Sequence, residues 1–387
     1  MSALSSLLVY RFANLFLGEF IQKIIPLLIY IQTDSLTWLG ISFASIWLPR
    51  VICQPFFGVI IDKFDIKSIF ISTDFVRAMI ILPLFWLDNP YMLSVIGAVF
   101  GLLAGLSYMG IEYAITHALD INRTPSTQAK IQNAEQLAMI LAPIAAGFVA
   151  GGGQLLAFSL VIIGYIIMPL WFIKSLKAHD KPIGSFLLAR LKSGFGEVLF
   201  GKQLLSLALV TALINLAEGV LFAILPAIIM GQFNQSSQMV GFVIALGSAI
   251  SIVVLSILSL SPKIKPTLCY YLGLGLIGTG VLLFGQPQSL WLCVAGYGLL
   301  IVGRVIFVVY MRIHRAALIK PENFSTTMGV FLSLILLPMP LSGGIVAWLD
   351  EPNSITVISY LLAAIFFGIV VLSAMKKGAN HADSHHR

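Results

Sequence analysis

Charge is scarce in this sequence. Only 10% of the 387 residues are charged and 59% are hydrophobic, whereas a soluble globular domain carries about 25% charge. The composition therefore excludes a soluble globular protein. Because 59% of 387 is about 228 apolar residues and one bilayer crossing takes about 20 of them, the composition predicts roughly eleven or twelve membrane spans.

Cysteine and catalytic motifs are also scarce. Each of the three cysteines, Cys53, Cys269 and Cys293, stands in an apolar stretch, where a thiol behaves as a small hydrophobe, so we expect no disulfide framework. HExxH, GxSxG and GxxxxGK[ST] elements are absent, which argues against hydrolase chemistry and ATP-driven transport. We expect no enzyme activity, no cofactor and no metal site, and we interpret the histidines of the terminal HADSHHR as a solvated tail.

Apolar runs predict an all-α membrane protein with twelve transmembrane helices. Their predicted ranges are 7–32, 38–61, 68–87, 91–117, 131–150, 154–173, 204–230, 239–260, 268–285, 290–311, 326–348 and 354–375. The first lacks a basic leader and a cleavage site, so we expect it to be retained and not to be a signal peptide. The predicted domains are a six-helix bundle (1–173), a cytoplasmic linker with an amphipathic helix (174–203), a second six-helix bundle (204–375) and a cytoplasmic tail (376–387).

The basic residues predict the orientation. The chain has 23 Lys and Arg against 16 Asp and Glu, a formal net charge of +7. With both termini inside, the outer loops hold no Lys or Arg, and the inner segments hold all of these cations except five within spans: Arg11, Lys23, Arg50, Arg77 and Arg304. Because cytoplasmic loops concentrate Lys and Arg, the surplus reports membrane topology and does not indicate a nucleic-acid partner.

Ionisable residues inside the predicted spans indicate an aqueous path or an ion pair, because a charge within the bilayer is costly. The candidates for proton coupling are Glu19, Glu218, Glu112 and Glu135. The candidates for binding an anionic substrate are Lys23, Arg50, Arg304, Asn14, Gln22 and Asn215. A structural Glu19–Lys23 pair, snorkelling of Glu112 and Glu135 to the inner interface and amides that merely join helices remain open alternatives.

Two further patterns concern the helices themselves. A weak internal repeat relates the first span, NLFLGEFIQKIIP, to the seventh, NLAEGVLFAILP. When the two segments are aligned, Glu19 falls close to the position of Glu218. Prolines predict helix interruptions that would let the spans bend around a cavity. These prolines are Pro26, Pro49, Pro55, Pro143, Pro226, Pro338 and Pro340.

The segment GVIIDKFDIKSIFISTDFVRA, which follows the second span, resembles the signature loop of the major facilitator superfamily. The residues that carry this resemblance are Gly58, Asp62, Lys63, Asp65, Lys67, Asp74 and Arg77. Asp65 stands where many members have Gly, which resembles a bacterial exporter branch that includes siderophore, macrolide and lysophospholipid transporters. The likeness covers the N-terminal half well and the C-terminal half mainly through hydropathy, and it implies that the loop latches an inner gate.

LAPIAAGFVAGGG in the fifth span resembles the antiporter motif of the same superfamily. The positions that carry it are Ala142, Pro143, Ala146 and Gly147, with Ala at two positions where the motif has Gly. Small residues at these positions allow tight helix packing. The resemblance therefore implies an exporter.

The residues and the resemblance together predict a proton-coupled exporter, an antiporter of a small anionic molecule that works by alternating access. We expect a carboxylate-type siderophore as cargo, protons and the lipid bilayer as partners, a monomer, and a place in the bacterial inner membrane. The alternatives are a multidrug efflux transporter, a lysophospholipid carrier and a non-transporting membrane sensor.

Overall fold

The computed structural model describes most of the chain. Its described residues are 3–86, 89–115, 119, 125–176, 187–259, 265–286, 288–319, 324–349 and 354–385. Side chains within helices are outside this description at 58–59, 62–63, 125–129, 187–193, 259, 316, 324–326 and 374–385. In these described ranges the regular structure is entirely helical, as the sequence predicts.

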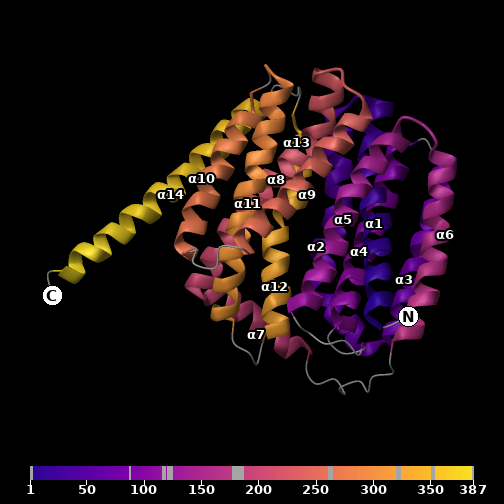
Figure 1. Cartoon of the computed structure of the whole chain (residues 1–387), viewed down its shortest axis with the longest axis horizontal. Helices are drawn as coiled ribbons and strands as arrows, with labels where there is room; N and C mark the ends of the chain where they lie inside the picture. Colours follow the sequence, from indigo (N-terminus) through magenta and orange to yellow (C-terminus); the bar gives the residue numbers. More distant parts are fainter. Residues whose placement is uncertain are drawn as a thin grey trace. The chain divides into compact units, whose positions relative to one another are not determined.

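The helices follow one another along the chain (Figure 1). The first half holds α1 (Ala3–Thr33), α2 (Leu36–Lys63), α3 (Ile66–Ile81), η1 (Leu82–Phe85), α4 (Pro90–Tyr113), α5 (Pro125–Ala150), α6 (Gln154–Phe172) and η3 (Ile173–Ser175). The second half holds α7 (Leu187–Phe200), α8 (Lys202–Pro226), η4 (Ala227–Gln232), α9 (Ser237–Ser259), α10 (Pro266–Phe284), α11 (Leu290–Leu318), α12 (Phe324–Leu336), α13 (Pro338–Ala347) and α14 (Ile355–His385).

The predicted membrane spans are confirmed. Within the described part of the chain, 12 helical segments are long and apolar enough to cross a membrane. Every end of these segments lies within four residues of the predicted end, which is the precision that hydropathy alone allows. The eleventh span, Thr327–Ala347, combines α12 and α13.

The predicted proline interruptions are only partly correct. Pro26, Pro49, Pro55 and Pro143 stand inside continuous helices, because neighbouring groups can compensate for the single backbone hydrogen bond that a proline removes. Pro226 instead ends α8, and the π-helical turn η4 follows it. The eleventh span is divided at Leu337, directly before Pro338.

The chain separates into two compact units, which we describe separately. Unit 1 comprises Met1–Ala245 and Ile319–Trp348, and unit 2 comprises Leu246–Leu318 and Leu349–Arg387. These units follow contacts and not the two sequence halves, so the six-plus-six domain division remains a prediction. Of the predicted linker, residues 177–186 lie outside the described residues.

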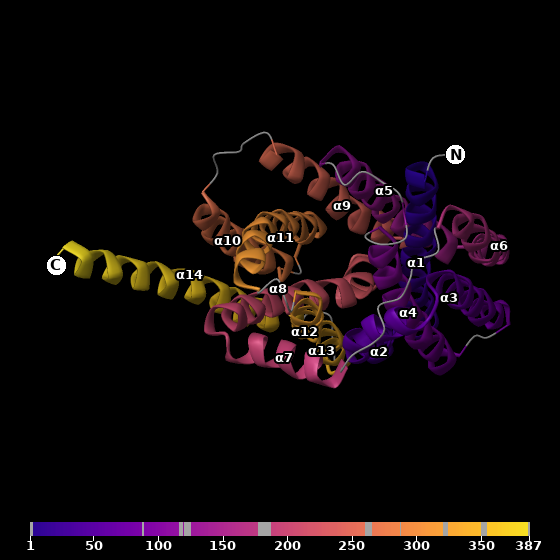
Figure 2. The same ribbon diagram turned by 90° about the horizontal axis from the view of Figure 1, so that it is seen from below.

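Helix α1 occupies the middle of the first-half helices of unit 1. It packs against α2, α4, α5 and α6, and Figure 2 shows these helices around it. Near its N-terminal end, Tyr10 is fully buried and stacks on Phe172 with ring centroids 4.2 Å apart. Phe70 completes this aromatic core at 5.5 Å from both rings.

Helix α7 lies within the predicted linker, where the sequence predicts an amphipathic helix. It packs against α8 and α12 of unit 1. The Thr327 hydroxyl of α12 donates a hydrogen bond to Glu197 Oε2 of α7 at 2.8 Å. The linker helix is therefore fixed to the second-half helices of its unit.

Unit 2 is built around the packing of α10 against α11. Glycines on both helices allow their backbones to touch: a Cβ on Gly280 would overlap the backbone of Gly296 and Leu300. Helix α14 packs against the same α10. Small residues at an interface are typical of helix association inside a membrane.

Candidate functional site

A buried carboxylate on α3 forms the first polar cluster of unit 1. Asp74 and Arg77 are each 1% exposed, and Arg77 Nη1 lies 3.1 Å from Asp74 Oδ1. From α1, the Tyr10 hydroxyl donates to Asp74 Oδ2 at 2.7 Å and Asn14 Nδ2 donates to Asp74 Oδ1 at 3.3 Å. Ser107 of α4 donates to Asn14 Oδ1 at 3.5 Å. We call these five residues the Asp74 cluster.

Two residues of the signature-loop motif, Asp74 and Arg77, belong to the Asp74 cluster. The other motif residues lie outside it. Asp65 caps α3, since its Oδ2 accepts a hydrogen bond from Ser68 N at 3.4 Å, and Lys67 is half-buried in the first turn of that helix. The remaining motif side chains are outside the description: Gly58, Asp62 and Lys63. The latch role of the motif therefore stays a prediction.

A second cluster ties α1 to α4 and α5. The Arg11 side chain is 2% exposed, and its Nη2 lies 2.9 Å from Glu112 Oε1 and 2.6 Å from Glu135 Oε1. Arg11 Nε also donates to Glu135 at 2.7 Å. The Tyr108 ring lies 4.7 Å from the guanidinium carbon. Both candidate carboxylates thus share one arginine, and this favours the structural alternative for them.

Sequence reasoning did not identify Arg11 as their partner. The three residues come from spans that are far apart in the sequence, so no helical spacing relates them. One sequence signal does indicate that these residues could pair. Arg11, Glu112 and Glu135 all lie toward the predicted inner ends of their helices. Charges at equal depth in a bilayer are expected to pair.

A third group of charges lies deeper along α1. Lys23 Nζ is 3.3 Å from Glu19 Oε2, and these side chains are 22% and 17% exposed. The ammonium also lies 5.0 Å from the centroid of the Phe222 ring on α8, a favourable cation–π arrangement. Gln22 turns back onto its own helix and donates to Gly18 O at 3.4 Å.

Arg50 of α2 belongs to the same group. Its guanidinium lies 5.0 Å from the Trp47 ring centroid and within the electrostatic influence of Glu19. Its stem packs against Gly105 of α4, where a Cβ would come within 2.9 Å of Arg50 Cγ. Among the described residues, the buried Arg50 Nε has no hydrogen-bond partner. We call Glu19, Lys23 and Arg50 the central charged group.

Helix α8 brings the second half of the internal repeat to this group. Phe222, which faces Lys23, stands four residues after Glu218, just as Lys23 stands four residues after Glu19. Residues four apart share a helix face, so buried Glu218 lies on the face of α8 turned toward Lys23. One turn earlier, Asn215 Nδ2 donates to Ile335 O of α12 at 2.6 Å.

The antiporter-like motif lies at a tight contact of α5 with α9. The Ser237 hydroxyl donates to Gly147 O at 2.8 Å, and a Cβ on Gly241 would overlap Pro143 O. Ala142 and Ala146 are completely buried. The small residues therefore do allow close packing, as the resemblance implies.

A similar contact joins α2 to α13. A Cβ on Gly40 would overlap the backbone of Gly343 and Ala347, and one on Gly343 would overlap Gly40 O. A third is made by η4, where a Cβ on Gly231 would overlap the Tyr30 hydroxyl of α1. All three contacts lie within about two turns of loops that the positive-inside pattern predicts to be outside. Unit 1 is therefore tightly packed at its predicted outer end.

The last candidate cation, Arg304, belongs to unit 2. It lies on α11 and is half-buried, and its role as a substrate residue stays a prediction. Within the described residues, no three His, Cys, Asp or Glu side chains are grouped so that they could hold a metal ion.

Comparisons with known proteins agree with this architecture. A sequence model of the Major Facilitator Superfamily matches residues 7–333, whereas comparison with curated proteins gave no significant match. Among solved structures, the chain is similar to the nucleoside transporter NupG, at 12% identity and a TM-score of 0.71, over 97% of this chain and 99% of that one.

Two other solved structures are similar over nearly the whole chain. One is a bacterial homologue of the iron transporter ferroportin in an inward-facing state, with 13% identity, a TM-score of 0.72 and coverage of 95% of this chain and 98% of that one. The other is a POT family transporter in complex with a thioalcohol-conjugated peptide, with 13% identity, a TM-score of 0.70 and coverage of 96% of both chains. Likeness at these identities shows the fold alone. Because the family match spans most of the sequence, the chain belongs to the major facilitator superfamily, and it is a multi-pass membrane protein of secondary transport and not an enzyme.

Proposed function

We propose that this transporter is a proton-coupled exporter of a small anionic molecule. The observation that carries the proposal is the central charged group, in which Lys23 and Arg50 lie within membrane spans. An arginine cannot lose its proton to escape burial, and the Arg50 Nε has no hydrogen-bond partner among the described residues. A carboxylate of the cargo would supply the missing acceptor and the compensating charge.

Glu19 and Glu218 are the proposed proton-coupling residues. Glu19 is held by Lys23 at 3.3 Å, and Glu218 is buried on the face of α8 that carries Phe222. A carboxylate inside the membrane can exchange protons where a water path reaches it. Glu112 and Glu135 share Arg11, so in this proposal they hold the bundle together and the transported proton uses the other pair.

Export is supported by the antiporter-like packing and by the tight outer end. A transporter closed at its outer end is in a state that opens to the inner side, which the predicted topology makes the cytoplasm. An exporter loads its cargo in that state, whereas an importer releases it there, so the antiporter-like packing carries the direction in this proposal. The resemblance to an exporter branch supports a carboxylate-type siderophore as the cargo. In this proposal the protein works as a monomer in a bacterial inner membrane.

Transport into inside-out membrane vesicles tests the proposal. Vesicles with an acidic lumen are given a radiolabelled tricarboxylate chelator, and its accumulation and the accompanying proton efflux are measured together. We expect accumulation that collapses with the proton gradient, and at least about a tenfold loss of transport in Lys23→Gln and Arg50→Gln, because each tenfold corresponds to about 1.4 kcal/mol of binding.

The controls separate this proposal from its competitors. Gln22→Ala is the matched control, because Gln22, although a substrate candidate from the sequence, donates within the described residues to the backbone of its own helix; it should transport normally. Comparison of iron chelators secreted with and without the protein tests the cargo in cells. Unchanged secretion together with broad drug hypersensitivity of the deletion strain would refute the siderophore proposal in favour of multidrug efflux.

A further inference from the structure

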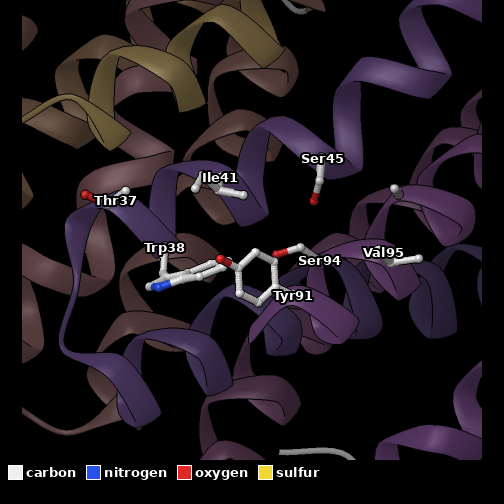
Figure 3. Close-up of a pocket in the computed structure, with 8 residues that line it drawn as sticks. Thr37, Trp38, Ile41, Ser45, Tyr91, Ser94 and Val95 are labelled. Carbon is white, nitrogen blue, oxygen red and sulfur yellow. The ribbon is translucent and has the colours of Figure 1, made fainter. Parts of the chain in front are cut away.

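A groove runs between the first turns of α2 and α4 in unit 1, away from the central charged group. It has a volume of about 420 Å³. Its floor consists of the small residues Ser45, Ser94 and Ala98, and its walls include Ile41 and Val95. Figure 3 shows the Ser45 and Ser94 hydroxyls pointing toward the same space between the two helices.

The groove follows from how α2 and α4 pack. Next to it the helices are in direct contact, since a Cβ on Gly101 would overlap Ile46 O and one on Gly97 would lie 3.0 Å from Ile46 Cγ1. Beside this contact the facing side chains are too small to fill the gap. The groove is therefore a fixed feature of the helix pair, set by backbone contact and not by a loop.

The groove is continuous with the lipid-facing surface of the protein. Ile41 and Val95 lie in membrane-spanning segments and are 38% and 57% exposed. Exposed apolar side chains extend the same surface along both helices, namely Leu48, Ile52 and Met92. Surfaces of this kind on a membrane span contact acyl chains.

The outer end of the groove is aromatic and its side wall holds a polar group. Trp38 and Tyr91 meet edge to face with ring centroids 4.4 Å apart, in the first turns of their helices, and Trp and Tyr concentrate at the level of lipid headgroups. Ser94 lies about one turn deeper, is 6% exposed, and its Oγ has no hydrogen-bond partner among the described residues. A buried hydroxyl donor normally has an acceptor.

We propose that this groove binds one phospholipid of the surrounding leaflet. The acyl chain lies against Ile41 and Val95, and an ester carbonyl accepts the hydrogen bond of Ser94 once that side chain turns from its buried position toward the groove. A phospholipid ester provides acceptors and no donor, and it sits just below the headgroup level marked by Trp38 and Tyr91. This is a site for a structural lipid, separate from the proposed cargo site.

Native mass spectrometry of the whole protein tests the site. The protein is purified in detergent with added palmitoyl-oleoyl phosphatidylglycerol, and bound lipid is counted per chain. We expect one retained phospholipid. Ala98→Phe, which fills the floor, should lower its occupancy at least about tenfold, while Ser94→Ala should weaken binding about threefold, since a hydrogen bond inside a membrane is worth about 0.6 kcal/mol on average.

Leu160→Phe is the matched control, because Leu160 is 58% exposed on α6 and lies outside the groove; it should keep the lipid. If Ala98→Phe does not fold, Ser45→Leu fills the same floor from α2. Equal lipid retention in the filled variants and the control would overturn the proposal. So would a retained mass other than a phospholipid, or a dimer that disappears when the groove is filled.

Discussion

The Asp74 cluster and the central charged group both place charged side chains within the spans of unit 1, yet they differ in burial and in how many hydrogen bonds hold those charges. Asp74 and Arg77 are each 1% exposed, and Asp74 accepts hydrogen bonds from Tyr10, Asn14 and Arg77. Lys23 has one ion pair, at 3.3 Å, and is 22% exposed. Arg50 faces the Trp47 ring. Its buried Nε has no hydrogen-bond partner within the described structure, and neither has the Nε of Arg77, but Arg77 also pairs with Asp74.

This difference is the one we expect between a structural role and a binding role. A buried network with several internal hydrogen bonds fixes one arrangement of the helices, and removing one member leaves the others buried and unpaired. Removing a member of a more exposed group of cations costs less free energy of folding, and such a group can accept a further anion. The comparison therefore predicts opposite effects on stability and transport for the two regions.

The largest effect on stability should come from Asp74→Ala. This change leaves the Arg77 guanidinium, the Tyr10 hydroxyl and the Asn14 amide without their shared acceptor. Removing one partner of a buried ion pair typically costs about 3–5 kcal/mol. We expect the free energy of unfolding to fall by that amount, measured by unfolding in detergent micelles.

The matched variant for this comparison is Lys23→Gln in the central charged group. Its free energy of unfolding should fall by no more than about 1 kcal/mol, the upper value for exposed ion pairs. Equal destabilisation by Asp74→Ala and Lys23→Gln would show that the two regions do not differ as the comparison states.

A smaller and graded effect is expected at Arg11. Glu135 accepts from Arg11 Nε, lies 2.6 Å from Nη2 and is 18% exposed, whereas Glu112 accepts from Nη2 and is 46% exposed. Glu135→Gln should cost about 1–3 kcal/mol, the range for losing a hydrogen bond to a charged group. Glu112→Gln should cost about 0.2–1 kcal/mol, as for exposed ion pairs. Unfolding in detergent micelles measures both, and the reverse order would contradict this structure.

The sequence predicts the membrane-spanning helices of this protein better than the polar contacts between them. Hydropathy finds all the spans of the described chain because about 20 apolar residues must cross a bilayer, and the i, i+3 spacing of Asp74 and Arg77 is compatible with the ion pair that they form. The contacts of Tyr10 with Asp74 and of Arg11 with Glu135 link residues 64 and 124 positions apart. Such contacts depend on which helices become neighbours and how each rotates, and periodicity does not fix either.

The prolines are a second case in which the sequence alone does not determine the local structure. Pro143 and Pro338 look alike in sequence, each following an apolar run that ends in a small or aliphatic residue. Yet α5 continues through Pro143, where it packs on α9, while the eleventh span breaks just before Pro338. Tertiary packing decides whether a proline bends a helix, breaks it or only removes one backbone hydrogen bond from it.

Asn215→Ala should have a smaller effect than the Glu135 change. The Asn215 side chain donates to Ile335 O at 2.6 Å and so joins α8 to α12. Losing one such bond inside a membrane costs about 0.6 kcal/mol, and at most about 1.7. Stability in detergent should fall by this amount while vesicle transport is retained. A complete loss of transport in a stable variant would move Asn215 from helix packing to the binding site.

The smallest effect on stability, and the most informative effect on transport, is expected from Glu19→Gln. In the proposed mechanism the anion and the Glu19 carboxylate compete for Lys23, so protonation of Glu19 would release the ammonium for the anion. The variant mimics that protonated state, and we expect it to bind the tricarboxylate more tightly and with less dependence on pH, measured by equilibrium binding in detergent.

Competition at Lys23 links anion binding to proton uptake by Glu19, whereas an antiporter must release a proton when the anion binds. The exchanged proton must then leave from another carboxylate, and buried Glu218 is the candidate on the facing helix. Glu218→Gln should therefore abolish accumulation driven by the proton gradient while leaving anion binding intact. If Glu19→Gln instead weakened binding and Glu218→Gln left gradient-driven accumulation unchanged, the two carboxylates would have the opposite roles, and proton and anion would move in the same direction.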